Sequence, residues 1–187
     1  MKVRAEQAAT VGVAEHRSTR VSVRRAMGIT VHTGWGACVV VGGSLADPEV
    51  VANAVVEILP DRERFCFHSA AEMELEAAAE WIERMRNKAL RTARQALAPL
   101  TPGVDVCAIV AKEGESGDLG AVMGSHPRIH TAEGCFYRDV LRAASPIPAR
   151  IVPPSSLDIS LVGRLAAPPW GRDQKLAALA AWSLIGR

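Results

Sequence analysis

The chain of 187 residues is long enough for one globular domain with a full hydrophobic core, and 49% hydrophobic against 22% charged residues is a globular composition. Aromatic residues make up only 4%, so aliphatic side chains must build most of that core. No apolar run approaches the roughly 18 residues that a membrane span needs, and the N-terminus lacks the apolar segment of a secretory signal. We therefore expect a cytoplasmic protein with no membrane partner.

The charge is unevenly distributed along the chain. The net charge is +2, yet residues 1–26 carry six Lys and Arg against two Glu, which leaves the remainder mildly acidic. We expect residues 1–25 to form a flexible basic arm and residues 26–187 to form a single domain. A basic arm can contact phosphates, which makes Arg24 and Arg25 candidate nucleic-acid ligands. The alternative is a solvated leader without a binding role.

The four cysteines are widely spaced, which argues against a zinc ribbon or a redox pair. Most of them lie in apolar, strand-like runs of the sequence. Buried reduced thiols in a cytoplasmic protein are therefore the expected state.

The stretch from Met27 to Gly43 predicts a β-hairpin. Its apolar runs at 27–33 and 37–43 flank a Gly-Trp-Gly sequence, which predicts a tight turn with Trp35 at its tip. The segment 50–59 suits a helix or a strand by composition, but its β-branched residues favour a third strand.

The clearest predicted helix runs from about 69 to 98, since Ser69 and Glu72 form a capping-box pattern and Pro99 stops the helix. The nearly all-apolar run 104–111 predicts a strand that is covered on both faces. The remaining predicted elements are a helix or turn at 118–125, a helix at 131–144 with Thr131 as its N-cap, a strand at 147–153, a short helix at 155–166 and a final helix at 172–185.

This order predicts an α/β fold with a mixed sheet, in which a three-strand antiparallel meander is joined by two parallel strands and helices cover both faces. It resembles the RNase H-like superfamily. The stretch "MGITVHTGWGACVV" is similar to the first hairpin of RuvC-type Holliday-junction resolvases and of actin-like ATPases. "GVDVCAIV" resembles the fourth strand of the RuvC type, and "RDQKLAALAAW" resembles its last helix. The pieces H-T-G-W, S-H-x-x-I-H-T-A-E-G and P-P-W-x-x-D-Q-K also resemble a bacterial protein family without an assigned activity.

The resemblance implies a nuclease that works with two divalent metal ions, Mg²⁺ or Mn²⁺, held by carboxylates on strand 1, strand 4 and the last helix. The strand-1 position is Thr30 in this sequence, and the strand-4 position is Val110. Asp173 on the last helix is the one matched acid. Glu113 and Glu115 follow strand 4 and offer substitutes, although a loop glutamate is more often simply solvated.

Histidines form the second set of candidates. His32 ends strand 1, and the predicted topology allows it to approach His126, His130, Glu133 and Asp173 in one cleft. Histidine suits proton transfer near neutrality, and a carboxylate can orient it. Each of these residues also has a structural interpretation, as a turn, capping or core residue. His126 and His130 have the i, i+4 spacing of metal ligands, which Pro127 restricts to the start of a helix.

We therefore predict an RNase H-like domain that binds nucleic acid, either as a histidine-assisted nuclease or as a degenerate, non-catalytic one. The candidate catalytic residues are His32, His126, His130, Glu133 and Asp173. The candidate ligand-binding residues are Trp35, His68, Arg24 and Arg25, with Trp35 able to stack on a base. The alternative is a module of the same fold that binds a protein partner or a small molecule. The sequence leaves the oligomeric state, and whether the protein is an enzyme, open.

Overall fold

A computed structural model of the protein describes residues 24–165 and 170–185. The basic arm predicted at 1–25 lies almost entirely outside these residues. The strands are β1 (Ala26–His32), β2 (Trp35–Gly43), β3 (Pro48–Glu57), β4 (Val106–Val110) and β5 (Ala149–Val152). The α-helices are α1 (Cys66–Ala70), α2 (Leu75–Leu97), α3 (Leu119–Met123), α4 (His126–Ala144) and α5 (Arg172–Trp182). Short 3₁₀ helices span Ala98–Leu100, Pro154–Ser156 and Ile159–Arg164.

The strands form one mixed sheet in the order β3-β2-β1-β4-β5. β1 pairs antiparallel with β2, and β2 pairs antiparallel with β3. β4 and β5 arrive through helical crossovers and run parallel to β1. This is the RNase H-like fold, and the predicted fold class is confirmed. The predicted strand at 50–59 is also confirmed as β3.

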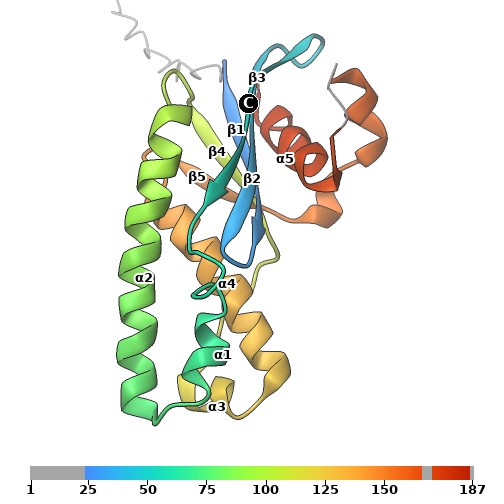
Figure 1. The fold of residues 1–187 in the computed structure, drawn as a ribbon. Coiled ribbons are helices and arrows are strands. Elements are labelled where there is room, and N and C mark those ends of the chain that lie inside the picture. The colour runs from blue at the N-terminus through green and yellow to red at the C-terminus, as the bar shows by residue number, and fades with distance from the viewer. Residues whose placement is uncertain (1–23, 166–169, 186–187) are drawn as a thin grey trace, which may run out of the picture.

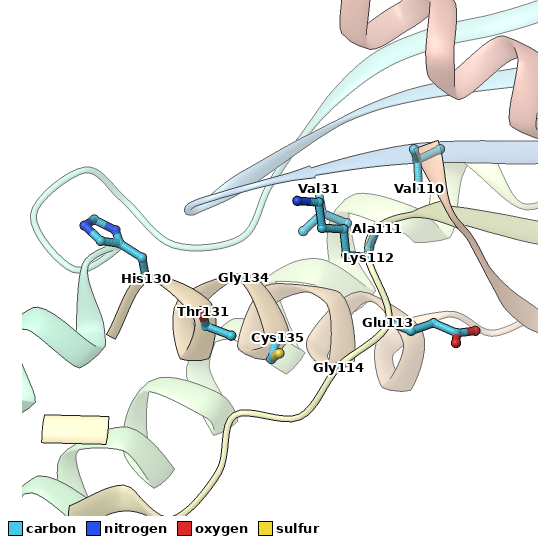
Figure 2. A pocket seen from close by; sticks show the side chains of 10 residues that line it. All are labelled: Val31, Val110, Ala111, Lys112, Glu113, Gly114, His130, Thr131, Gly134 and Cys135. Carbon is cyan, nitrogen blue, oxygen red and sulfur yellow. The ribbon is translucent and has the colours of Figure 1, made fainter. Parts of the chain in front are cut away.

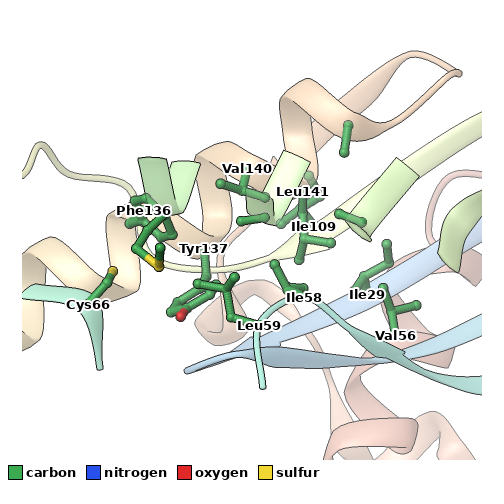
Figure 3. Packing of buried hydrophobic residues seen from close by; sticks show 14 of the residues in the cluster. Ile29, Val56, Ile58, Leu59, Cys66, Ile109, Phe136, Tyr137, Val140 and Leu141 are labelled. Carbon is green, nitrogen blue, oxygen red and sulfur yellow. The ribbon is translucent and has the colours of Figure 1, made fainter. Parts of the chain in front are cut away.

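Helices cover the two faces of the sheet unequally (Figure 1). The long helix α2 and the helix α4 lie on one face, and α5 packs against β1, β2 and β4 on the other. Because side chains alternate along a strand, Met27 and Ile29 of β1 enter the larger core, while Ala26 enters the smaller core beneath α5. Figure 3 shows the larger core, to which Ile29 of β1, Ile109 of β4 and Leu141 of α4 all contribute, with Ile109 beside Leu141.

The backbone of α5 lies directly on β1 because both surfaces carry small residues. A Cβ atom on Gly28 would lie 1.8 Å from the carbonyl oxygen of Ala177. Ala177 and Ala181 lie at this contact, and the helix also buries Ala178 and Ala180. This close approach fixes the height of α5 above the sheet and so positions Asp173, in its first turn, beside the end of β1.

Two predicted helix starts are wrong. The helix predicted from Ser69 is two helices, and Ser69 Oγ donates to the Phe65 carbonyl within α1 instead of capping α2. The chain bends between them because α1 buries Cys66 and Phe67 in the larger core. Similarly, α4 begins at His126, five residues before the predicted cap. Pro127 is tolerated there because a first helical turn needs no internal N–H donor.

The turn of the first hairpin also differs from the prediction. β1 ends at His32 and β2 begins at Trp35, so the turn consists of Thr33 and Gly34. Gly34 adopts a φ of 89°, a left-handed conformation that favours glycine. Trp35 therefore lies directly opposite His32 in the sheet and not at the tip of the turn.

The four cysteines are unpaired and buried, as expected for reduced thiols. Burial raises the pKa of the Cys107 thiol to about 12, which keeps it protonated at neutral pH. Among the described residues, no helix combines the length and the apolar character needed to cross a membrane.

Candidate functional site

The first group of candidate residues lies where β1 ends and β2 begins. The rings of His32 and Trp35 stack with centroids 4.2 Å apart and planes 11° from parallel. On the α5 side, His32 Nε2 lies 3.1 Å from Oδ1 of Asp173. Cross-strand pairing places the two rings opposite each other, and the close packing of α5 brings the carboxylate to them.

The His32–Asp173 pair is open to solvent. The two side chains are 36% and 35% exposed. Their atoms are close enough for an ion pair, but the angle does not satisfy a hydrogen bond and leaves His32 Nε2 without a hydrogen-bond partner. Such a half-exposed pair contributes little to stability. Nε2 itself is buried, so a ligand can contact the imidazole only through its other atoms.

The hairpin turn is hydrogen-bonded to the segment that follows β3. The Gly34 carbonyl accepts hydrogen bonds from the backbone N–H groups of Ile58, at 2.8 Å, and Leu59, at 3.1 Å. A Cβ atom on Gly34 would lie 2.7 Å from Cβ of Arg64. The close approach that glycine allows here is therefore to the protein's own chain.

This fastening creates a polar cavity of about 360 Å³ with Trp35 and Arg64 in its wall. Nη1 of Arg64 pairs with Oδ1 of Asp61 at 2.9 Å, and its Nε is buried without a hydrogen-bond partner among the described residues. The other lining residues are Thr33, Gly34, Val55, Glu57, Leu59, Pro60 and Asp61.

The positions that the resemblance implies for metal-binding carboxylates do not fit a two-metal site. Thr30 and Val110 are direct partners in the β1–β4 register, so the predicted positions do lie side by side. Both are nearly fully buried. The Thr30 hydroxyl donates to the Ala37 carbonyl at 3.5 Å, and Val110 has no polar atom in its side chain. Asp173 alone offers a carboxylate here, and it already faces His32.

A second group of candidate residues gathers where α1 meets the start of α4. The rings of His68, His126 and His130 contact one another edge to face, with centroids between 4.5 and 5.4 Å apart. Nδ1 of His68 also lies 3.0 Å from Oε1 of Glu133, which is only 2% exposed. Glu133 is thus a buried carboxylate whose hydrogen-bond partner is a histidine of this cluster.

His130 also lines a cavity of about 330 Å³ between α4 and the loop after β4. Figure 2 shows that His130, Thr131 and Cys135 come from one helix, while Lys112 and Glu113 come from the loop. The remaining lining residues are Val31, Val110, Ala111, Gly114 and Gly134. The loop is held in place by Arg138, whose Nη1 donates to the carbonyls of Lys112 and Gly114.

The contacts of the predicted catalytic residues thus fall into two groups. His32 meets Asp173, while His126, His130 and Glu133 gather with His68, which the sequence suggested only as a ligand-binding residue. Val31, the neighbour of His32, lines the same cavity as His130, so both groups lie near the same end of β1. That they serve one reaction in one cleft stays a prediction.

Arg24 and Arg25 lie far from both groups, because they precede the first residue of β1 and His32 is its last. Their backbone N–H groups donate to Oδ2 of Asp105 at 2.9 and 3.2 Å. These two hydrogen bonds lower the pKa of the Asp105 carboxyl. Any contact of the two arginines with a ligand would therefore occur at the opposite end of β1.

Sequence reasoning missed Arg64 and Lys112. Both belong to irregular segments in which a single basic residue has no distinguishing pattern. The backbone contact between Gly34 and residues 58–59 joins segments distant in sequence, so no local signal could have revealed the cavity beside Trp35.

The chain matches no protein-family model and no curated protein. Among solved structures it is similar to Thermus thermophilus RuvC in complex with a Holliday junction substrate, with 14% identity, a TM-score of 0.49, and coverage of 86% of this chain and 91% of that chain. A second Thermus thermophilus RuvC structure has 13% sequence identity and a TM-score of 0.44, and the match covers 85% of this chain and 91% of that chain. The yeast mitochondrial Holliday junction resolvase has 13% sequence identity and a TM-score of 0.44, and the match covers 88% of this chain and 77% of that chain. At these identities the likeness concerns the fold and not the site.

Proposed function

We propose that this protein binds a single-stranded segment of nucleic acid at Trp35 and does not cleave it by a two-metal mechanism. The observation that carries the proposal is the rigid, half-exposed stack of Trp35 on His32 beside the cavity lined by Arg64. Stacking on an aromatic ring is the main way in which proteins hold unpaired bases, and it tolerates every base.

Trp35 is well prepared for stacking before any ligand arrives. His32 stacks on it, the strand register fixes its backbone, and the fastened turn prevents the hairpin from moving away. A base that stacks on this residue orders no further protein segment, so little of the stacking free energy is lost to conformational entropy. The cavity of about 360 Å³ beside the indole offers room for a base.

The polar groups of the same cavity suit a nucleotide. Nη1 of Arg64 is engaged by Asp61 and Nε is buried, which leaves Nη2 as the donor for a phosphate. The carboxylates of Glu57 and Asp61 can accept hydrogen bonds from the amino groups of a base. A purely basic groove would favour any polyanion. A cavity with both a guanidinium and carboxylates instead favours a nucleotide, whose phosphate and base can contact the two kinds of group.

Hydrolysis by two metal ions lacks its ligands, because Thr30 and Val110 replace two of the three implied carboxylates. A histidine-assisted reaction at His32 and Asp173 remains the second candidate. It is favoured by the 3.1 Å approach of the two side chains and by their access to solvent. Neutral His32 could accept a proton at Nδ1 from a bound hydroxyl or water, while Asp173 beside the buried Nε2 stabilises the charged ring.

Fluorescence anisotropy with labelled single-stranded DNA, single-stranded RNA, duplex DNA and a four-way junction tests the proposal. We expect single strands to bind best and Trp35→Ala to weaken their binding about 10- to 100-fold, the loss of one stacked base. Trp35→Phe should restore most of the affinity. Leu161→Ala removes an exposed hydrophobic side chain from another surface and should change nothing.

Two outcomes would contradict the proposal. Equal affinity of the Trp35→Ala variant and the unaltered protein would place the binding surface elsewhere. Cleavage of any of these substrates that depends on Mg²⁺ or Mn²⁺ would show that the chain assembles a metal site without the missing carboxylates. Metal-independent cleavage that is lost in His32→Ala would instead support the histidine-assisted reaction.

A further inference from the structure

We propose that His68, His126 and His130 form a binding site for a zinc-type transition-metal ion, and that Glu133 is the positioning residue of this site. The inference goes beyond the proposed function, since none of these four residues belongs to the Trp35 cavity. It is also distinct from the two-metal site implied by the resemblance, which would use carboxylates on β1, β4 and α5.

The fold brings the three imidazoles together from two helices. His126 and His130 are four residues apart in the first turns of α4 and therefore project from the same side of the helix. His68 reaches them from α1. One ligand nitrogen from each ring lies within 4.8 Å of the others. Three neutral imidazoles that converge in this way are a typical donor set for zinc.

Small ring movements complete the coordination geometry. A tetrahedral zinc ion with Zn–N bonds of about 2.0–2.1 Å needs nitrogens about 3.3 Å apart. His126 and His130 are exposed, so their rings can rotate toward an ion without disturbing the core. His68 is half-buried and forms the fixed corner of the site.

Glu133 is the second, independent observation that points to a metal ion. A carboxylate that is 2% exposed is unfavourable unless it has a strong partner. Here that partner is Nδ1 of His68, at 3.0 Å. A proton held on Nδ1 by this carboxylate leaves the lone pair of Nε2 free and aimed away from Glu133. Metal-ligating histidines are commonly oriented in this way, because the carboxylate fixes the tautomer and increases the basicity of the ring.

The fourth coordination position would be open. Three protein ligands leave room for water or for an oxyanion on a tetrahedral ion. His130 also lines the cavity of about 330 Å³ that contains Lys112 and Glu113. A metal-bound ligand could extend from the ion into this cavity, so the site fits a ligand-binding ion better than a closed structural one.

Isothermal titration calorimetry with ZnCl₂ tests the inference, with protein from which any affinity tag has been removed. We expect one zinc ion per chain. His126→Ala and His130→Ala should each abolish this binding, and neither should lower the melting temperature, since both side chains are exposed. Glu133→Gln should retain the stoichiometry with about 10- to 100-fold weaker affinity. His32→Ala removes a histidine outside the cluster and is the matched control.

Cobalt provides a readout that a purely structural role of these residues would not affect. Co²⁺ in a tetrahedral histidine site should give intense visible absorption bands, and these should be absent in the His126→Ala variant. Zinc binding that is unchanged in both His126→Ala and His130→Ala would overturn the inference, as would the absence of saturable binding by the unaltered protein. Neither result bears on the Trp35 cavity, whose test needs no zinc.

Discussion

The described part of the chain contains two histidine–carboxylate pairs that have nearly the same separation and very different surroundings. His32 Nε2 lies 3.1 Å from Asp173, and both side chains are about one-third exposed. His68 Nδ1 lies 3.0 Å from Glu133, whose side chain is 2% exposed. Only the buried pair satisfies hydrogen-bond geometry.

Burial decides what each carboxylate can do for its histidine. Water competes for Asp173, so this carboxylate can adjust to a ligand but holds His32 only weakly. Glu133 has little access to water, and its interaction with His68 is therefore strong and directional. We infer that the α5 side is adapted to contact a ligand through His32 and Trp35, whereas the α4 side is adapted to hold an imidazole in one fixed orientation.

The largest expected effect follows from Gly28→Ala, which should displace α5 from the sheet. The new methyl group would lie 1.8 Å from the Ala177 carbonyl oxygen. Since the clash is with backbone, no side-chain rotation relieves it, and α5 must move. We expect a loss of about 3 kcal/mol in the free energy of unfolding, at the upper end of overpacking costs, measured by urea denaturation. If the free energy of unfolding is unchanged, α5 does not contact β1 in this way.

A charge at Thr30 should have the next largest effect. Thr30→Asp restores the residue type that the resemblance implies, but at a position that is only 4% exposed. We expect it to lower the free energy of unfolding by about 2–4 kcal/mol at neutral pH. Burial would raise the pKa of the new carboxyl above its ordinary value of about 4, so the loss should shrink as the pH falls from neutral toward about 4 and stay constant at lower pH. Urea denaturation across this pH range measures it.

Thr30→Val is the matched control for this prediction. It removes the hydroxyl and keeps the shape, and the hydrogen bond that it loses is long, at 3.5 Å. The change should therefore be within about 1 kcal/mol. If Thr30→Asp is as stable as Thr30→Val at neutral pH, the space between β1 and α5 already accommodates a carboxylate, and the contrast between the two sides weakens.

Much of the fold could be predicted because its signals are local. The Gly-rich hairpin at 27–43 and the apolar run at 104–111 have strand patterns that do not depend on distant contacts, and the pairing of β4 with β1 follows from chain order. The boundary between α1 and α2 could not be predicted in this way. The pattern of Ser69 and Glu72 favours a helix start locally, but the burial of Cys66 and Phe67 in the core begins a helix earlier.

The candidate site was predictable only as a set of residue types. The sequence identified His32, His130 and Asp173 as candidates, and topology brought them toward one end of the sheet. Which histidine faces which carboxylate depends on how α1 and α4 are placed and rotated against each other in the core. Neither the placement nor the rotation has a local signal, so the contact between His68 and Glu133 appears only in three dimensions.

Removing each carboxylate compares the two pairs directly. We expect Glu133→Ala to lower the free energy of unfolding by about 2–3 kcal/mol, because a buried hydrogen bond that involves a charged group is lost. Asp173→Ala should change it by less than about 1 kcal/mol, since the pair is exposed and poorly aligned. Urea denaturation of both variants measures the difference. Equal losses would mean that burial does not distinguish the pairs.

The smallest expected effect comes from Gly134→Ala, which makes on the α4 side the same substitution as Gly28→Ala on the α5 side. A Cβ atom on Gly134 would have nothing within 4 Å, apart from its own helix. Since alanine favours a helix interior more than glycine does, we expect stabilisation by about 0.5–1 kcal/mol. For a domain of this size, that corresponds to a melting temperature about 1–4 °C higher, which scanning calorimetry would detect. A lower melting temperature would mean that the cavity beside His130 is filled, and that α4 packs there as tightly as α5 packs on β1.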